Sequence, residues 1–267
     1  MRFINQKIGQ FLFLSDRCLH RSLRTIYNCN GYSLFSSQKW CAKGNMIEGN
    51  RRGAIIYSSG MENKTISRQF APNESSTLLE YVLDSVWTVA DELFVVFKSE
   101  PELSLVEDLS HFGVRILTTA EGQSPILAVC EAFRSASSEH CLLATERIPL
   151  LKPNVALALF ENAQGLDLAI PRWKNGRIEP LLAVYRRKSF VRVAETSSKR
   201  FTSDLKADLD SNVINRLFAV KYVAIDDELK FLDPELDSFL DVRDEKSLKA
   251  ARDKASIRGK RTTRQAK

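Results

Sequence analysis

The chain has 267 residues, of which 44% are hydrophobic and 27% charged, and its formal net charge is +6. This length and apolar content suffice for one α/β domain with a buried core, or for one domain with appendages. The longest apolar run near the start, FLFL at residues 11–14, is far shorter than the roughly 20 residues of a membrane-spanning helix, so no span is predicted.

The positive charge is concentrated at the two ends of the chain. Residues 1–45 carry seven Lys and Arg against one Asp, and residues 244–267 carry nine against three acids, so the region between them has a net charge of −6. An acidic body with two basic ends argues against a groove that follows a nucleic-acid backbone. Either end alone could still bind RNA, DNA or an anionic surface.

Residues 1–50 differ in composition from the rest, because Ser, Arg and Asn are frequent and acids almost absent. This is typical of a disordered leader, a targeting peptide, or an extension translated upstream of a start at Met46. The five cysteines are odd in number and contain no CxxC pair, so they support neither a zinc site nor a disulfide framework. They predict a reducing, cytoplasmic location.

From Arg52 onward, apolar runs typical of buried strands alternate with segments whose apolar residues recur at helical spacing. The predicted elements in chain order are strand 54–57, helix 75–90, strand 92–98, helix 101–112, strand 113–118, helix 124–137, strand 140–145, helix 152–164, strand 167–171, strand 179–186 and strand 218–225. Asn175-Gly176 predicts a hairpin turn between strands 167–171 and 179–186.

This alternation predicts an α/β fold, a Rossmann-like three-layer sandwich with a mostly parallel sheet and a hairpin insertion. We expect it to span residues 51–251, with a short final helix that fades into a basic, solvated tail at 252–267. Ligands of such sheets bind beyond the carboxyl ends of the strands. The first strand ends in a small-residue turn, YSSG at 57–60, whose backbone N–H groups can hold phosphate.

Four sequence blocks stand out between residues 53 and 251. They are GAIIYSSG with the following SRQF and STLLEYVLDSV, then GVRILTTAEGQSPILAVCEAF, CLLATERIPLL and LAIPRWKNGRIEPLLAVYRR. In order and wording, these blocks resemble the nucleotidyltransferases of the molybdenum cofactor guanylyltransferase type. SFLDVRDEKSLKAA sits where the family has its closing segment, with Asp241 and Arg243 in place of two asparagines. The resemblance implies transfer of a nucleotide, with GMP from GTP favoured, to a phosphorylated acceptor such as molybdopterin, with Mg²⁺ as cofactor.

The first block implies the nucleotide-binding and catalytic residues. Gly60 stands at the last glycine of the family's phosphate turn, and Arg68 stands at its signature lysine, with Lys64 in the same loop. Arg68 and Lys64 would then be catalytic. The residues that would bind the nucleotide are Tyr57, Ser58, Ser59, Gly60 and Arg68.

The third block leaves two alignments for the metal ligand. Counting back from Pro149 without a gap places Arg147 at the family's metal-binding Asp, whereas one inserted residue places Glu146 there; Glu146 is the predicted ligand. By the same resemblance, Arg172 and Glu179 of the fourth block would bind the substrate. A threonine, at 118 or 119, falls where the family has another acid, and Glu121 is a weaker substitute for it.

These departures from the family pattern leave two other functions open. A relative that has lost catalysis could keep the fold to bind a nucleotide, a pterin or a partner protein. A sugar-nucleotide or cytidylyl transferase could share the fold, because no base-reading loop is recognisable and fold alone does not choose a substrate. The sequence does not fix the oligomeric state.

Overall fold

The structure is a computed structural model, and it describes residues 51–59, 77–110, 112–197 and 201–265. All of them belong to one compact unit, residues 47–267. The leader predicted for residues 1–50 lies outside the described residues, as do Gly60, Lys64 and Arg68 of the predicted site. Among the described helices, none has the length and apolar content needed to cross a membrane.

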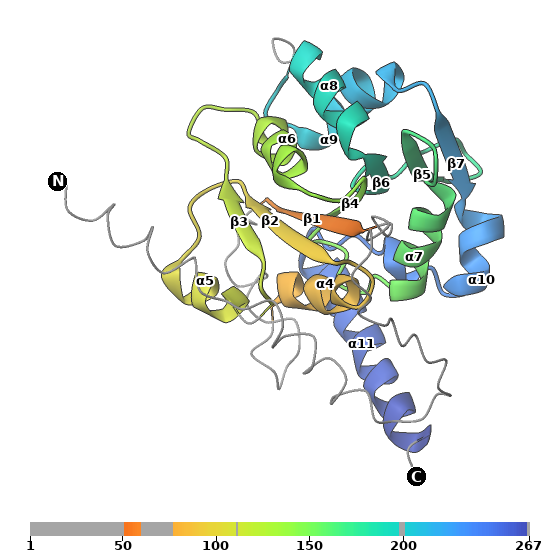
Figure 1. Cartoon of the computed structure of the whole chain (residues 1–267). Coiled ribbons are helices and arrows are strands. Elements are labelled where there is room, and N and C mark those ends of the chain that lie inside the picture. The colour runs from red at the N-terminus through yellow and green to blue at the C-terminus, as the bar shows by residue number, and fades with distance from the viewer. Residues whose placement is uncertain (1–50, 60–76, 111, 198–200, 266–267) are drawn as a thin grey trace, which may run out of the picture. The chain divides into compact units, whose positions relative to one another are not determined.

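The described residues form a seven-stranded sheet with the strand order β3-β2-β1-β4-β6-β5-β7 (Figure 1). Strand β6 is antiparallel to both of its neighbours, and the other six strands run in one direction. The strands are β1 (Arg52–Ser58), β2 (Glu92–Phe97), β3 (Arg115–Thr118), β4 (His140–Thr145), β5 (Leu168–Arg172), β6 (Leu182–Arg186) and β7 (Val220–Ala224). The predicted mostly parallel sheet is therefore confirmed.

The one antiparallel strand comes from the hairpin predicted at Asn175-Gly176. The turn closes through hydrogen bonds from Trp173 N to Arg177 O and from Gly176 N to Trp173 O, of 2.8 and 2.9 Å. Gly176 has a φ of 87°, which glycine adopts without the strain that a side chain would bring. The hairpin sends β6 back between β4 and β5.

Helices cover both faces of the sheet, as Figure 1 shows. Successive residues of β1 point to opposite faces. Ile56 packs in one apolar core with Val82 of α4, whereas Ile55 packs in a second core with Phe133 of α6. The helices are α4 (Leu78–Trp87), α5 (Leu103–Ser110), α6 (Pro125–Ser135), α7 (Pro153–Asn162), α8 (Arg187–Ser197), α9 (Leu205–Asp208), α10 (Lys230–Leu232) and α11 (Glu245–Gln265). The predicted three-layer sandwich is confirmed.

Several helical segments after β6 differ from the sequence-based prediction, and α8 and α11 are the longest of them. Helix α8 was not predicted, because it is rich in charged residues and buries only a narrow apolar face that includes Phe190 and Val193. Helix α11 continues to Gln265, where a short helix fading into a tail was predicted. Its Ala, Lys, Arg and Gln residues are all good helix formers.

The chain reverses direction across the sheet between β1 and β4. It leaves β1 to add β2 and β3 on one side, and then returns to place β4 on the other side of β1. In open α/β sheets, ligands bind at such a switch point, beyond the carboxyl ends of the strands. The topology thus directs attention to Ser58, at the end of β1, and to Glu146, directly after β4.

Candidate active site

The carboxyl ends of β1 and β4 are joined through Glu146. The ladder between the two strands extends one residue past β4, because Glu146 N donates to Tyr57 O over 3.2 Å. The Glu146 carboxylate accepts hydrogen bonds from Ser58 Oγ at 2.6 Å and from Ser59 Oγ at 3.3 Å. The residue is only 4% exposed. The structure therefore brings together three of the predicted site residues, Ser58, Ser59 and Glu146.

Glu146 is a buried carboxylate whose charge is only partly compensated. Burial raises the pKa of Glu146, and bonds from Ser58 and Ser59 together with the charge of Arg147 offset that rise only in part. Burial, followed by the charges of Glu146 and Asp204, also raises the pKa of Tyr57 to about 12, so its phenol stays protonated. An additional positive charge beside Glu146 would stabilise its ionised form.

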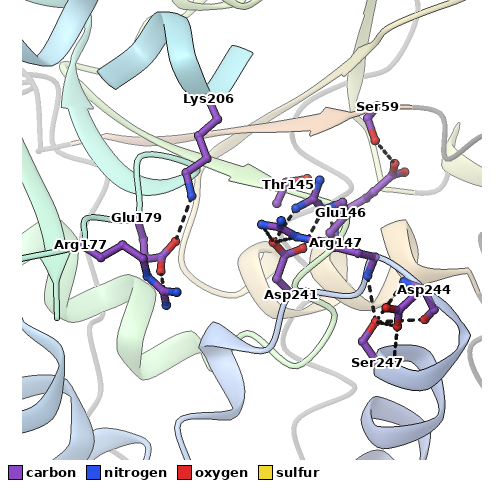
Figure 2. A network of polar contacts seen from close by, with 11 residues as sticks. Ser59, Thr145, Glu146, Arg147, Arg177, Glu179, Lys206, Asp241, Asp244 and Ser247 are labelled. Atoms are coloured by element: carbon purple, nitrogen blue, oxygen red, sulfur yellow. Dashed lines mark hydrogen bonds and ion pairs between the residues drawn. The ribbon is translucent and has the colours of Figure 1, made fainter. Parts of the chain in front are cut away.

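Arg147 points away from Glu146 and toward the C-terminal part of the chain, as Figure 2 shows. Its Nε and Nη2 donate to the two carboxylate oxygens of Asp241 over 2.7 and 2.5 Å. Arg243 Nε donates to Asp241 Oδ2 over 2.8 Å. Burial alone would raise the pKa of Asp241, but the bonds from Arg147 and Arg243 outweigh it, and the pKa is lowered. Asp241 is therefore ionised and bridges two guanidinium groups.

A pocket lies beside this cluster, beyond the end of β4 and the start of β6. It contains two basic and two acidic side chains, and Arg147 and Asp241 form part of its wall. The residues that line it are Thr145, Arg147, Ile148, Glu179, Pro180, Leu181, Leu182, Lys206, Ser238, Phe239 and Asp241.

The two residues predicted to bind the substrate lie in different surroundings. Glu179 lines the pocket, where it accepts hydrogen bonds from Trp173 Nε1 at 2.7 Å and pairs with Arg177 at 3.0 Å and Lys206 at 4.0 Å. Arg172 is exposed and lies 4.5 Å over the ring of Tyr222 on β7, and it is not among the residues that line this pocket.

The donor set at Glu146 can be compared with what Mg²⁺ requires. Among the described residues, no group of three His, Cys, Asp or Glu side chains could hold a metal ion. Mg²⁺ is commonly held by one or two carboxylates together with substrate phosphates and water. Glu146 offers one undercompensated carboxylate with two hydroxyls beside it, which fits that coordination. Asp241 does not fit, because both of its oxygens bind guanidinium groups.

Two of the charged residues that line the pocket, Asp241 and Lys206, were not among the predicted site residues. Asp241 meets Arg147 across 94 positions of sequence, and such a contact leaves no local pattern. Lys206 lies on the four-residue helix α9, which is too short to show a periodicity. Thr119, the substitute for an acid, is buried with its Oγ1 unpaired among the described residues, and Glu121 is exposed.

Comparison with known proteins identifies the family of the domain and agrees with its fold. Residues 57–210 match the family described as MobA-like NTP transferase domain. A probable molybdenum cofactor guanylyltransferase of Methanosarcina acetivorans is 26% identical over 201 residues, which cover 72% of this chain and 85% of the relative.

Two solved structures share the fold. Molybdopterin-guanine dinucleotide biosynthesis protein A from Archaeoglobus fulgidus superposes with a TM-score of 0.58 at 21% identity, over 77% of this chain and 99% of that one. A 2-C-methyl-D-erythritol 4-phosphate cytidylyltransferase from Thermus thermophilus superposes with a TM-score of 0.54 at 17% identity, over 76% of this chain and 98% of that one. Because the family match covers more than half of the sequence, this chain belongs to the MobA-like NTP transferase domain family.

Proposed function

We propose that this protein is a nucleotidyltransferase that moves GMP from GTP to a phosphorylated, pterin-like acceptor such as molybdopterin. The observation that carries the proposal is the position of Glu146, a buried carboxylate at the switch point of the sheet that accepts hydrogen bonds from the end of β1. Its chain neighbours Thr145 and Arg147 line the pocket. Family membership and the name of the Methanosarcina relative support the choice of reaction.

In the proposed reaction, an oxygen of the acceptor phosphate attacks the α-phosphorus of GTP. The bond between the α-phosphorus and its bridging oxygen to the β-phosphorus breaks, and pyrophosphate leaves with that oxygen. Catalysis of such a step rests on positioning and on stabilising negative charge. We assign the phosphate turn to Tyr57, Ser58, Ser59 and Gly60 and phosphate contacts to Arg68 and Lys64, of which only Tyr57, Ser58 and Ser59 lie within the described residues.

We further propose that Glu146 holds Mg²⁺, with Ser58 and Ser59 fixing the carboxylate in place. When bound, Mg²⁺ would neutralise charge on the phosphate oxygens of the nucleotide. Glu179 would bind the acceptor from the pocket wall, and Arg172 would contact the acceptor from outside the pocket. Cys130 and Cys141 are buried free thiols, and we place the reaction in the reducing cytoplasm.

The test is release of pyrophosphate by the purified full chain. With Mg²⁺, the phosphorylated pterin acceptor and GTP, the protein should release pyrophosphate only when the acceptor is present. CTP and ATP in parallel reactions test which nucleotide is transferred to this acceptor. Absence of turnover with all three triphosphates would rule out the transfer reaction with this acceptor.

A second candidate function is nucleotide or pterin binding without transfer. It is favoured by the fact that Glu146 and Asp241 both already accept hydrogen bonds from protein groups. If this candidate is correct, calorimetry will show nucleotide binding that Mg²⁺ does not change, and Glu146→Ala will leave the affinity unaltered. An affinity that depends on Mg²⁺ and is lost in Glu146→Ala would argue against it.

A further inference from the structure

The Arg147 side chain presents unused hydrogen-bond donors to the pocket. A guanidinium group has five N–H donors, and the pair with Asp241 uses Nε–H and one N–H of Nη2. The side chain is 26% exposed and lines the pocket. No other side chain of the described residues is bonded to this guanidinium, so the remaining donors are free to meet a ligand.

Asp241 fixes two guanidinium groups next to each other. It pairs with Arg147 on one side and with Arg243 on the other, where Nε and Nη2 lie 2.8 and 2.6 Å from Oδ2. Two arginines against one carboxylate leave the cluster with a net charge of +1. Because the carboxylate holds both forks, neither side chain has to lose much freedom when it binds a ligand.

The charge of this cluster is opposite to that of a metal site. Arg147 occupies the position where ungapped matching of the CLLATERIPLL block would place a carboxylate. A guanidinium repels a divalent cation but binds phosphate oxygens with two parallel hydrogen bonds. The cluster of Arg147, Asp241 and Arg243 can therefore contact phosphate oxygens without a bridging metal ion.

We propose that Arg147 and Arg243, bridged by Asp241, form a phosphate-binding site that works without a divalent cation. The inference rests on the proposed function for the source of the phosphate, which is either the triphosphate tail of the nucleotide or the phosphate of the acceptor. The site binds phosphate oxygens in either case, and Glu146 is the residue that would hold the metal ion.

Isothermal titration of the full chain with inorganic pyrophosphate in EDTA tests this site. The wild type should bind, Arg147→Gln should bind roughly tenfold more weakly or worse, and Arg147→Lys should fall between them because it keeps the charge but loses the fork. The matched control is Arg192→Gln on α8, an exposed arginine outside the pocket, which should bind like the wild type.

A second variant guards against loss of folding. Arg243 is 62% exposed, so Arg243→Gln should fold normally and still weaken pyrophosphate binding severalfold. Thermal unfolding followed by circular dichroism verifies each variant. The proposal is overturned if the wild type does not bind pyrophosphate in EDTA, or if folded Arg147→Gln and Arg243→Gln bind it as the wild type does.

Competition identifies the source of the phosphate. If saturating GTP in EDTA abolishes Arg147-dependent pyrophosphate binding, the site holds the triphosphate tail. If inorganic phosphate still binds in the presence of GTP, and does so only with Arg147 intact, the site holds the acceptor phosphate. Pyrophosphate release in the transfer reaction is measured separately. Arg147-dependent binding of pyrophosphate without turnover would support this phosphate site and contradict the transfer reaction. Turnover without Arg147-dependent binding would support the transfer reaction and contradict this site.

Discussion

Ser58 Oγ donates a 2.6 Å hydrogen bond to Glu146 Oε2 and so ties the end of β1 to the end of β4 across 88 positions of sequence. The bond is buried, and the carboxylate that accepts it is almost inaccessible to water. Removing one partner of such a bond leaves a buried charged group with less compensation. The contact therefore affects both the stability of the sheet at the carboxyl ends of these two central strands and the position of Glu146.

The Ser58 bond should be measurable in the free energy of unfolding. We expect Ser58→Ala to lower that free energy by about 1–3 kcal/mol, because it removes a hydrogen bond to a buried charge. Ser59→Ala is the matched control. The bond from Ser59 to Glu146 is 3.3 Å long and only partly buried, so its loss should lower the free energy of unfolding by less. Urea unfolding of the two variants at neutral pH makes the comparison, and an equal or larger loss in Ser59→Ala would contradict it.

The pH dependence of stability should have opposite signs for Glu146 and Asp241. The pKa of Glu146 is raised above its usual 4.5, so the folded state loses stability as the pH rises through the folded pKa. Glu146→Gln removes this penalty and should gain stability relative to the wild type as the pH rises from 4.5 to 7. We would measure this difference by urea unfolding at several pH values.

For Asp241 the sign reverses. Its pKa is lowered from the usual 3.8, so it contributes stability above that value and loses the contribution as the pH falls through the folded pKa. Asp241→Asn should therefore be destabilised at pH 7, and progressively less so only as the pH falls below 3.8. If both substitutions showed the same pH trend, the charge assignments at these two residues would be wrong.

The wall of the pocket that carries Glu179 depends on a buried tyrosine. Tyr185 on β6 is fully buried, and its hydroxyl donates to Pro180 O over 2.9 Å. Tyr185→Phe should cost about 1 kcal/mol in the free energy of unfolding, because the carbonyl of buried Pro180 loses its partner. Chemical denaturation measures the cost, and an unchanged midpoint would show that the bond does not stabilise this wall.

Trp173 should report on ligands in the pocket. Its indole Nε1 donates to Glu179 over 2.7 Å, and its ring packs edge-on against Phe239 at 5.6 Å between centroids. Glu179 and Phe239 both line the pocket, so a bound phosphate ligand should change the emission of Trp173. Trp173→Phe should abolish the change on titration with pyrophosphate, and Trp87→Phe should keep it. The opposite pattern would place the ligand elsewhere.

Much of the fold could be predicted from the sequence because of its parallel strands. Strands buried on both faces read as continuous apolar runs, and the run at 140–145 coincides with β4. Helix α8 could not be predicted, since its short apolar stretch is interrupted and flanked by charged residues. Its position depends on tertiary packing of Phe190 against Phe133, whose rings stack at 4.0 Å.

The candidate site was less accessible to sequence reasoning. The resemblance identified Glu146 and Arg147 as alternatives at one position. In the structure both side chains form hydrogen bonds, Glu146 with Ser58 and Arg147 with Asp241, on opposite sides of the chain (Figure 2). No local pattern could show that Arg147 would meet Asp241, because the pairing is created by the return of the chain after β7. Their roles in binding and catalysis stay predictions.

The central claim is that Glu146 provides the carboxylate for a metal-assisted nucleotide site at the end of β1. It is tested most directly by the affinity for GTP, measured by calorimetry with Mg²⁺ and with EDTA. We predict that Mg²⁺ strengthens binding by the wild type and by Glu161→Gln, an exposed carboxylate control on α7, but not by Glu146→Ala. Binding that Mg²⁺ strengthens equally in Glu146→Ala, or that it leaves unchanged in the wild type, would contradict the claim.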